Sequence, residues 1–364
     1  MGIYKLGDIC QIVSGSTPKT GISEYWDGDI KWITPAEIND DTYIITDSVR
    51  KITKLAVEKT GLLELPKGTV ILSSRAPIGK VAIAGCTMYC NQGFKNFVCT
   101  EKINNKYLYW FLKNKTSYLN SLGRGATFKE LSKAIVSNIE IDVPDMRKQE
   151  DIVDNLERIN TIIKLRRRQI NALEEITKAR FVEMFGDVIR NDRGWPVRKF
   201  SDITNSRLGK MLDAKQQTGT CMYPYLANYN VQWFRFELDT LNQMDFNDKD
   251  REEFALEDGD LLVCEGGEIG RCAVWHNQVE NCYFQKALHR VRCNRDLILP
   301  DYLAWWFKYN CENGGFVAIE GAKATISHLT GAKMKDLDVA IPDIKDQCLF
   351  VEFIKQVNKS KLKE

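Results

Sequence analysis

The clearest pattern in the chain is a long run of apolar residues at helical spacing between Arg147 and Phe185. This stretch contains neither proline nor glycine, and at ~1.5 Å per residue one helix of this length measures roughly 58 Å. Apolar residues separated by alternating steps of four and three are Ile152, Leu156, Ile159, Ile163, Ile170 and Leu173. Only Arg166 interrupts the series, and the alternation is typical of a coiled-coil seam. We predict one long helix that packs against a second helix along this seam.

The second pattern is an internal repeat. Segments 65–72, 78–80, 107–111, 125–126 and 141–145 return as 256–263, 269–271, 302–306, 321–322 and 339–343. A helical pattern follows each Pro-Asp pair, so the repeat unit is a domain followed by a helix. We predict a first domain over 1–146, a central helix over 147–185, a linker over 186–198, a second domain over 199–342 and a short helix over 343–364.

Each domain is expected to mix strands and helices, which places the chain in the α+β class. Alternating β-branched and polar residues predict strands at 69–72, 81–84, 97–99 and 139–143, with a strand or turn at 5–14. Residues 107–122 form an amphipathic pattern that predicts a helix with Trp110 and Phe111 facing inward. A short helix is predicted over 129–136. The second domain is expected to repeat this order.

Composition adds few constraints. The chain has 364 residues, 44% hydrophobic and 27% charged, with a net charge of +2, which fits a soluble globular protein without a strong general attraction to polyanions. No signal-like or membrane-spanning apolar run occurs, so we expect a cytoplasmic location and no membrane partner. Eleven cysteines without a CxxC pair favour buried, reduced thiols over a disulfide or metal role.

The motifs of common enzymes fail when they are tested residue by residue. Residues 74–81 contain Gly79-Lys80, but Ser74 and Val81 replace the Gly and the Ser or Thr of a phosphate-binding loop. No GxGxxG occurs, and no Asn-Pro-Pro-aromatic motif of amino-methylating enzymes is found. Asp343-Ile344-Lys345 has the carboxylate-x-Lys spacing of some nucleases. Asp343 aligns with Asp145 in the repeat, however, and capping of the helix that follows explains both aspartates better. We therefore predict no catalytic residue, no metal and no cofactor.

Both halves instead place cations, amides and threonines on polar loops between strands. In the first half these residues are Thr17, Lys19, Arg75, Lys80, Gln92, Lys95, Arg124, Thr127 and Lys129. In the second half they are Lys210, Glu265, Arg271, Lys286, Lys323, Thr325 and His328. Such side chains suit contacts to DNA phosphates and base edges. Ordinary solvated turns have a similar composition, so this alternative stays open.

The order of these features resembles the specificity (S) subunit of type I restriction-modification systems over the whole chain. The motifs that carry the resemblance are Leu6-Gly7-Asp8-Ile9, the glycine pairs 68/79 and 259/270, the Gly-Ala loops at 125 and 321, the Val-Pro and Ile-Pro pairs before each helix, and Met184-Phe185-Gly186-Asp187. The second helix is shorter than the spacer usual in that family.

The resemblance implies a non-catalytic reader of double-stranded DNA that recognises a bipartite, asymmetric site. It implies two target-recognition domains joined by antiparallel coiled-coil helices with pseudo-two-fold symmetry. It also implies two methyltransferase subunits as partners, with restriction subunits bound through them. Two other interpretations remain: a specificity module of a related system in which recognition and enzyme are fused, and a tandem-repeat scaffold without a DNA role.

The short second helix leads to a prediction about docking. At ~1.5 Å per residue it reaches only ~30 Å, enough to cover roughly Leu165 to Phe185 of the central helix. The seam residues beyond that reach are then expected to form a docking surface for a methyltransferase subunit, for a second copy of the chain, or for both. These residues are Ile152, Leu156, Ile159 and Ile163. The alternative is that the first domain covers them.

Overall fold

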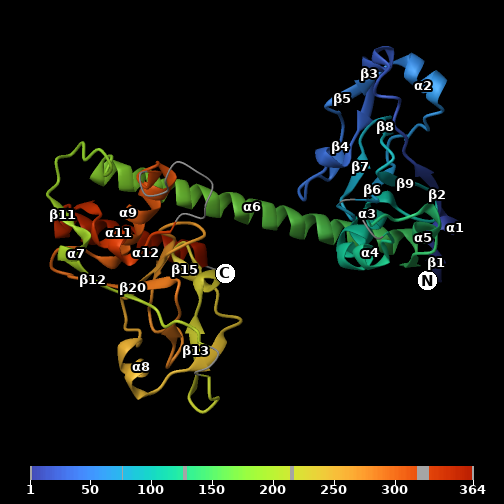
Figure 1. Cartoon of the computed structure of the whole chain (residues 1–364). Helices are drawn as coiled ribbons and strands as arrows, with labels where there is room; N and C mark the ends of the chain where they lie inside the picture. Colours follow the sequence, from blue (N-terminus) through green and yellow to red (C-terminus); the bar gives the residue numbers. More distant parts are fainter. Residues whose placement is uncertain (1, 76, 126–128, 214–216, 318–327, 363–364) are drawn as a thin grey trace. The chain divides into compact units, whose positions relative to one another are not determined.

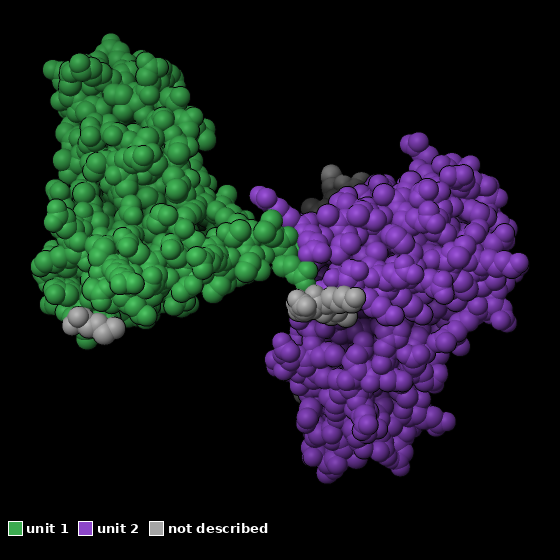
Figure 2. All heavy atoms as spheres, turned by 180° about the vertical axis from the view of Figure 1, so that it is seen from behind, with its two compact units in different colours: residues 1–166 green, residues 167–364 purple. Residues whose placement is uncertain are grey.

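The computed structural model describes residues 2–75, 77–125, 129–213, 217–317 and 328–362. The chain forms two compact units, residues 1–166 and 167–364, drawn in green and purple in Figure 2. The boundary lies within helix α6 (Met146–Phe185), so each unit contains one part of that helix. Its 40 residues form one continuous helix (Figure 1), which confirms the long helix predicted from the apolar period.

Unit 1 is built around two β-sheets. The five-stranded sheet has the order β2 (Cys10–Ser14), β9 (Phe94–Cys99), β6 (Val70–Ser73), β7 (Val81–Ala84) and β4 (Ile44–Ile45). The three-stranded sheet has the order β5 (Arg50–Ile52), β3 (Trp26–Ile33) and β8 (Tyr89–Cys90). A separate ribbon pairs β1 (Gly2–Lys5) with β10 (Glu140–Val143). Strands β6 and β7 are buried at every position, so the core of the unit lies on both faces of the larger sheet.

Short helices cover these sheets. They are α1 (Leu6–Ile9), α2 (Lys54–Thr60), α3 (Asn105–Asn114), α4 (Thr116–Leu122) and α5 (Lys133–Ser137), with single turns η1 (Ser23–Tyr25) and η2 (Pro35–Glu37). The side chain of Ser132 accepts a hydrogen bond from Ile135 N and caps α5. The short helix predicted at 129–136 therefore begins later than expected, because the serine cap fixes its start.

The helix predicted over 107–122 was wrong in two respects. It is divided into α3 and α4 at Lys115, whose amide bonds the carbonyl of Leu112 and tightens the end of α3. The buried side chains on α3 include Leu108 and Tyr109, whereas Trp110 and Phe111 are only half-buried. The helix is thus rotated relative to the prediction, and the two large aromatic rings lie at the margin of the core.

Unit 2 repeats this order of elements. A four-stranded sheet has the order β12 (Thr204–Leu208), β20 (Leu288–Cys293), β17 (Leu261–Cys264) and β18 (Cys272–Val274). A three-stranded sheet has the order β16 (Asn242–Asp245), β13 (Met222–Leu226) and β19 (Tyr283–Phe284). Two-stranded ribbons pair β14 (Val231–Gln232) with β15 (Arg235–Phe236), and β11 (Val197–Lys199) with β21 (Asp338–Ala340). Its helices are α7 (Phe200–Ile203), α8 (Asp248–Glu253), α9 (Pro300–Glu312), α11 (Gly331–Lys335) and α12 (Ile344–Leu362), with the turn η4 (Asn228–Asn230).

A buried glutamine fixes the helix that follows each domain. The side-chain amide of Gln149 donates to the carbonyls of Lys102 and Pro144, and its oxygen accepts from the amide of Asn104. Gln347 makes the same three bonds to backbone groups of unit 2, including the carbonyl of its own proline turn. Because an unpaired buried amide is costly, this arrangement ties the first turn of each helix to its own domain.

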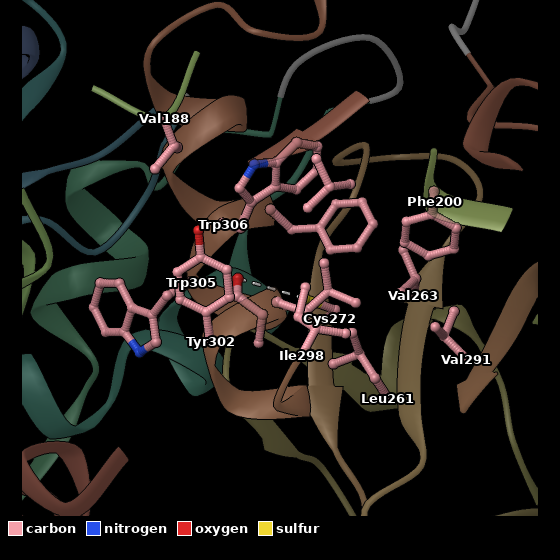
Figure 3. Close-up of a cluster of buried hydrophobic side chains, with 14 of the residues drawn as sticks. Val188, Phe200, Leu261, Val263, Cys272, Val291, Ile298, Tyr302, Trp305 and Trp306 are labelled. Carbon is pink, nitrogen blue, oxygen red and sulfur yellow. Dashed lines mark hydrogen bonds between the residues drawn. The ribbon is translucent and has the colours of Figure 1, made fainter. Parts of the chain in front are cut away.

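Aromatic rings join α6 to α12 within unit 2. Phe181 of α6 contacts Tyr302 and Trp305 of α9 and Phe350 of α12, with ring centroids 5.8, 6.3 and 5.4 Å away. Figure 3 shows Tyr302 and Trp305 on the same helix, within the buried core of the unit. Farther along α12, Lys361 forms an ion pair with Glu174. Later residues of α12 therefore contact earlier residues of α6, and the two helices are antiparallel.

The reach of α12 as far as Leu165 of α6 stays a prediction. Contacts between the two helices extend from Phe185 back to Glu174. The first turn of α12 lies against its own domain through Gln347.

Unit 1 covers one side of its part of α6. Tyr43 donates to the carboxylate of Glu157, and Lys106 forms an ion pair with the same group at 2.9 Å. Although burial opposes it, these hydrogen bonds hold the pKa of Glu157 below its usual range. Ile152 and Leu156 are half-buried, so the domain partly covers these two seam residues.

The cysteines are free thiols, and five of them are buried. Burial raises the pKa of Cys90 and Cys282 to about 12, which keeps both thiols protonated and unreactive. Cys348 is exposed on α12, so the expectation of buried thiols was wrong at that position. Among the described residues, every helix is too short or too polar to span a bilayer.

Candidate nucleic-acid interface

In unit 1, four loops meet around Glu130, on the segment before α5. The backbones of Glu130 and Arg124 exchange two hydrogen bonds, of 3.1 and 2.9 Å. The carboxylate of Glu130 lies 3.7 Å from the guanidinium of Arg75 and 3.5 Å from Nζ of Lys95. Two cations from different segments, Arg75 and Lys95, thus face one carboxylate, and the backbone of Arg124 is paired beside it.

Thr17 and Gln92 belong to the same cluster. The Thr17 hydroxyl donates to the side-chain oxygen of Gln92, and Arg75 donates to the Gln92 carbonyl at 3.2 Å. Gly15 makes this approach of loops possible, because an added Cβ would collide with the backbone of Asn91. The structure therefore brings together five of the residues predicted from sequence, namely Thr17, Arg75, Gln92, Lys95 and Arg124.

A hollow of about 860 Å³ opens beside this cluster. The charged side chains along it are Lys95, Arg124, Glu130 and Lys133. With three cations and one carboxylate, its wall favours an anion, and the exposed side chains of Arg124 and Lys133 are accessible to one. Sequence analysis missed Glu130 and Lys133, because neither belongs to a motif.

Other predicted residues lie elsewhere or serve the fold. Lys80 donates to the carbonyl of Pro35 at 3.0 Å, and Arg271 donates to the carbonyl of Asn228 at the same distance. These two cations hold equivalent turns, η2 and η4, in the two units. Lys19 and Lys129 are exposed on loops. Three further predicted residues, Thr127, Lys323 and Thr325, lie outside the described residues.

In unit 2 the corresponding loops carry more internal charge pairing. Lys210 is held by the carboxylate of Asp250 and the carbonyl of Asp245, both at 2.6 Å. Its amide bonds the carbonyl of Phe284, and its own carbonyl accepts from the amide of Lys286. Lys210 therefore anchors the loop, and the exposed Lys286 beside it is the cation open to a ligand.

A hollow of about 820 Å³ lies in unit 2, with His289 in its wall. His289 is buried, and its Nε2 has no hydrogen-bond partner among the described residues. Burial lowers the pKa of His289, although the nearby Glu265 acts in the opposite direction, so the ring is neutral at pH 7. Arg207 and Lys335 also line this hollow, together with three carboxylates.

The same backbone bonds define equivalent positions in the two units. Leu131 N bonds the carbonyl of Ser74 at 2.8 Å in unit 1, and Leu329 N bonds the carbonyl of Glu265 at 2.7 Å in unit 2. The residue before each leucine is Glu130 in unit 1 and His328 in unit 2. His328 is exposed and lies against Gly266. The framework is thus shared, while the side chains that it presents differ.

Comparison with known proteins identifies the class to which this arrangement belongs. The family model for the type I restriction modification DNA specificity domain matches residues 1–175 and 192–364. The chain belongs to this family.

Individual relatives agree with that assignment. The type I restriction enzyme MjaIX specificity subunit of Methanocaldococcus jannaschii is 37% identical over 225 residues, 57% of this chain and 52% of the relative. The chain thus spans about half the length of this relative.

Two solved structures share the fold. The type I restriction-modification S subunit from M. genitalium has a TM-score of 0.57 at 11% identity, covering 99% of this chain and 90% of that one. A structure described as the basis of complex assembly and conformational transition of the type I R-M system has a TM-score of 0.56 at 16% identity, over 99% and 90% of the two chains.

Proposed function

We propose that this chain is the DNA-reading subunit of a type I restriction-modification complex, and that it recognises a bipartite, asymmetric site in duplex DNA. The observation that carries the proposal is the pair of equivalent loop positions occupied by Glu130 in unit 1 and His328 in unit 2. The same backbone hydrogen bond holds this position in each unit, from Leu131 to Ser74 and from Leu329 to Glu265, but the side chains beside it differ. Two copies of one framework with different side chains suit two half-sites with different sequences.

The residues divide into two roles. Arg124 and Lys133 in unit 1, and Lys286 in unit 2, are exposed cations suited to phosphates. Arg75 and His328 lie on the loops that differ between units, and they are suited to base edges. These residues do not combine a nucleophile with a base and a group that orients the base. The proposed role is therefore recognition without catalysis.

The other subunits supply the chemistry in this proposal. Two methyltransferase subunits bind this chain, and restriction subunits join through them. We propose domains at residues 1–146 and 199–342, joined by helices 147–185 and 343–364 with the linker 186–198, and related by pseudo-two-fold symmetry. The antiparallel contacts between α6 and α12 support this arrangement.

Salt-dependent binding tests the DNA role. The affinity of the full chain for duplex DNA should fall linearly on a log–log plot as salt rises, with a slope of about −0.9 for each phosphate neutralised. Arg124→Ala combined with Lys133→Ala should make that slope shallower by about 2, because each lost phosphate contact removes about 1. Lys54→Ala on α2 removes an equal charge outside the cluster and should leave the slope unchanged. A wild-type chain with no salt dependence would favour the scaffold interpretation.

A domain exchange tests the bipartite site. Replacing residues 199–342 by the corresponding domain of another family member should change one half-site of the methylated sequence and leave the other unchanged. The reason is that each cluster is assembled within its own unit from its own loops. Sequencing of adenine methylation in a host that also carries the cognate methyltransferase gives the result. A change in both half-sites would contradict independent reading by the two domains.

A further inference from the structure

Arg75 and Glu130 form a pair at the margin of the unit 1 cluster. Their side chains are 40% and 41% exposed, and the guanidinium lies 3.7 Å from the carboxylate. We infer that this pair reads one G·C base pair in the half-site bound by unit 1, with Arg75 on the guanine and Glu130 on the cytosine. This inference rests on the proposed function, and it names the base pair and the residues that select it.

The guanidinium of Arg75 is held in place and still has donors to spare. One nitrogen donates to the Gln92 carbonyl at 3.2 Å and faces Glu130. A guanidinium carries five N–H donors in a fixed plane, so this contact leaves donors for a ligand. Guanine is the base that presents two acceptors, O6 and N7, along one edge in the major groove, and arginine binds both at once.

Glu130 is fixed from several sides, which gives its carboxylate a defined direction. Its backbone is paired with Arg124, and Leu131 beside it bonds Ser74. Nζ of Lys95, which is nearly buried, lies 3.5 Å from the same carboxylate. The Glu130 carboxylate is an acceptor without donors, and the exposed N4 amino group of cytosine is the donor that such an acceptor recognises.

The two residues together exclude the other orientation and an A·T pair. In a G·C pair, guanine O6 and cytosine N4 are neighbours in the major groove, so a donor beside an acceptor on the protein matches them. Adenine would turn its N6 donor toward Arg75, and thymine would turn its O4 acceptor toward Glu130. A donor would then face the Arg75 donors and an acceptor would face the Glu130 carboxylate. Neither pair can form a hydrogen bond, and an unpaired buried polar group is costly.

Unit 2 lacks this reader at the equivalent positions. Gly266 follows Glu265, as Arg75 follows Ser74, and His328 occupies the place of Glu130. The half-site read by unit 2 therefore serves as an internal reference for any change made to the pair.

The test is selection of bound sites from a randomised duplex DNA library by the full chain, followed by sequencing. The wild-type chain should yield a bipartite site with one strongly preferred G·C pair that depends on Arg75. In Arg75→Ala and Glu130→Ala, discrimination at that pair should fall by about tenfold to a hundredfold, while the other positions keep their preferences. Arg75→Lys keeps the charge but not the planar donor pair, so it should lose the guanine preference and keep the salt slope.

Each outcome separates this inference from the proposed function. If the wild-type chain selects no sequence, the proposed function fails. If the wild-type chain selects a bipartite site but Arg75→Ala keeps every base preference, the inference is overturned and the function stands. Equal weakening at all positions would assign Arg75 to a phosphate and would also overturn it. An unchanged half-site for unit 2 in each variant shows that the chain is folded.

Discussion

Replacing Phe181 by alanine is expected to destabilise unit 2 by about 3–5 kcal/mol. The Phe181 side chain is 1% exposed and contacts rings on both α9 and α12. Its loss leaves a cavity where α6, α9 and α12 meet, and rigid neighbouring rings fill such a space poorly. Guanidinium unfolding of the full chain gives the free energy, and hydrogen exchange of the α12 amides localises the effect.

Ile176→Ala is the matched control, because Ile176 lies on the same helix and is 52% exposed. An exposed substitution of this kind should change stability by less than about 0.5 kcal/mol. The exchange of amides in the β6 and β7 strands of unit 1 should be unchanged in both variants. A loss below about 1 kcal/mol for Phe181→Ala would show that these rings do not hold α12 against α6.

The sequence predicted the elements whose period is regular. The seam of α6 repeats over about six turns, from Ile152 to Leu173, and the repeated glycine pairs and Pro-Asp turns marked both domains. No helix or strand was predicted between residues 15 and 65, although the region contains β3 and α2. Strand β3 shifts register between Trp26 and Ile30, and Asp27 has a φ of 59°, so the alternation that marks a strand is broken there.

The candidate site was predictable only in part, for a different reason. Polar loops could be recognised from composition, and five of their residues do meet around Glu130. A loop cation does not show its partner in the sequence, however. Lys210 pairs with Asp250, and Lys80 bonds the turn at Pro35. Such contacts between distant segments depend on the folded chain, and they decide which cations remain available to DNA.

Introducing glutamates at Ile159 and Ile163 together is expected to abolish binding of a methyltransferase subunit. These two side chains are 54% and 45% exposed on α6, whereas Ile152 and Leu156 are half-buried against their own domain. Burial of each isoleucine by a partner contributes about 1.5–3 kcal/mol. Loss of both, with unpaired carboxylates in their place, should weaken the complex by at least about a hundredfold. Co-purification and calorimetric titration with the cognate subunit measure the loss.

Ile176→Glu provides the control for this double variant, because it places the same charge on an exposed isoleucine of α6 outside the seam. It should leave the complex intact, and both proteins should keep the helix content of the wild type by circular dichroism. DNA binding by the double variant should also be retained, because the loop clusters lie on other elements. If the methyltransferase still binds and only self-association is lost, the exposed seam joins two copies of this chain; if both survive, the seam is not a docking surface.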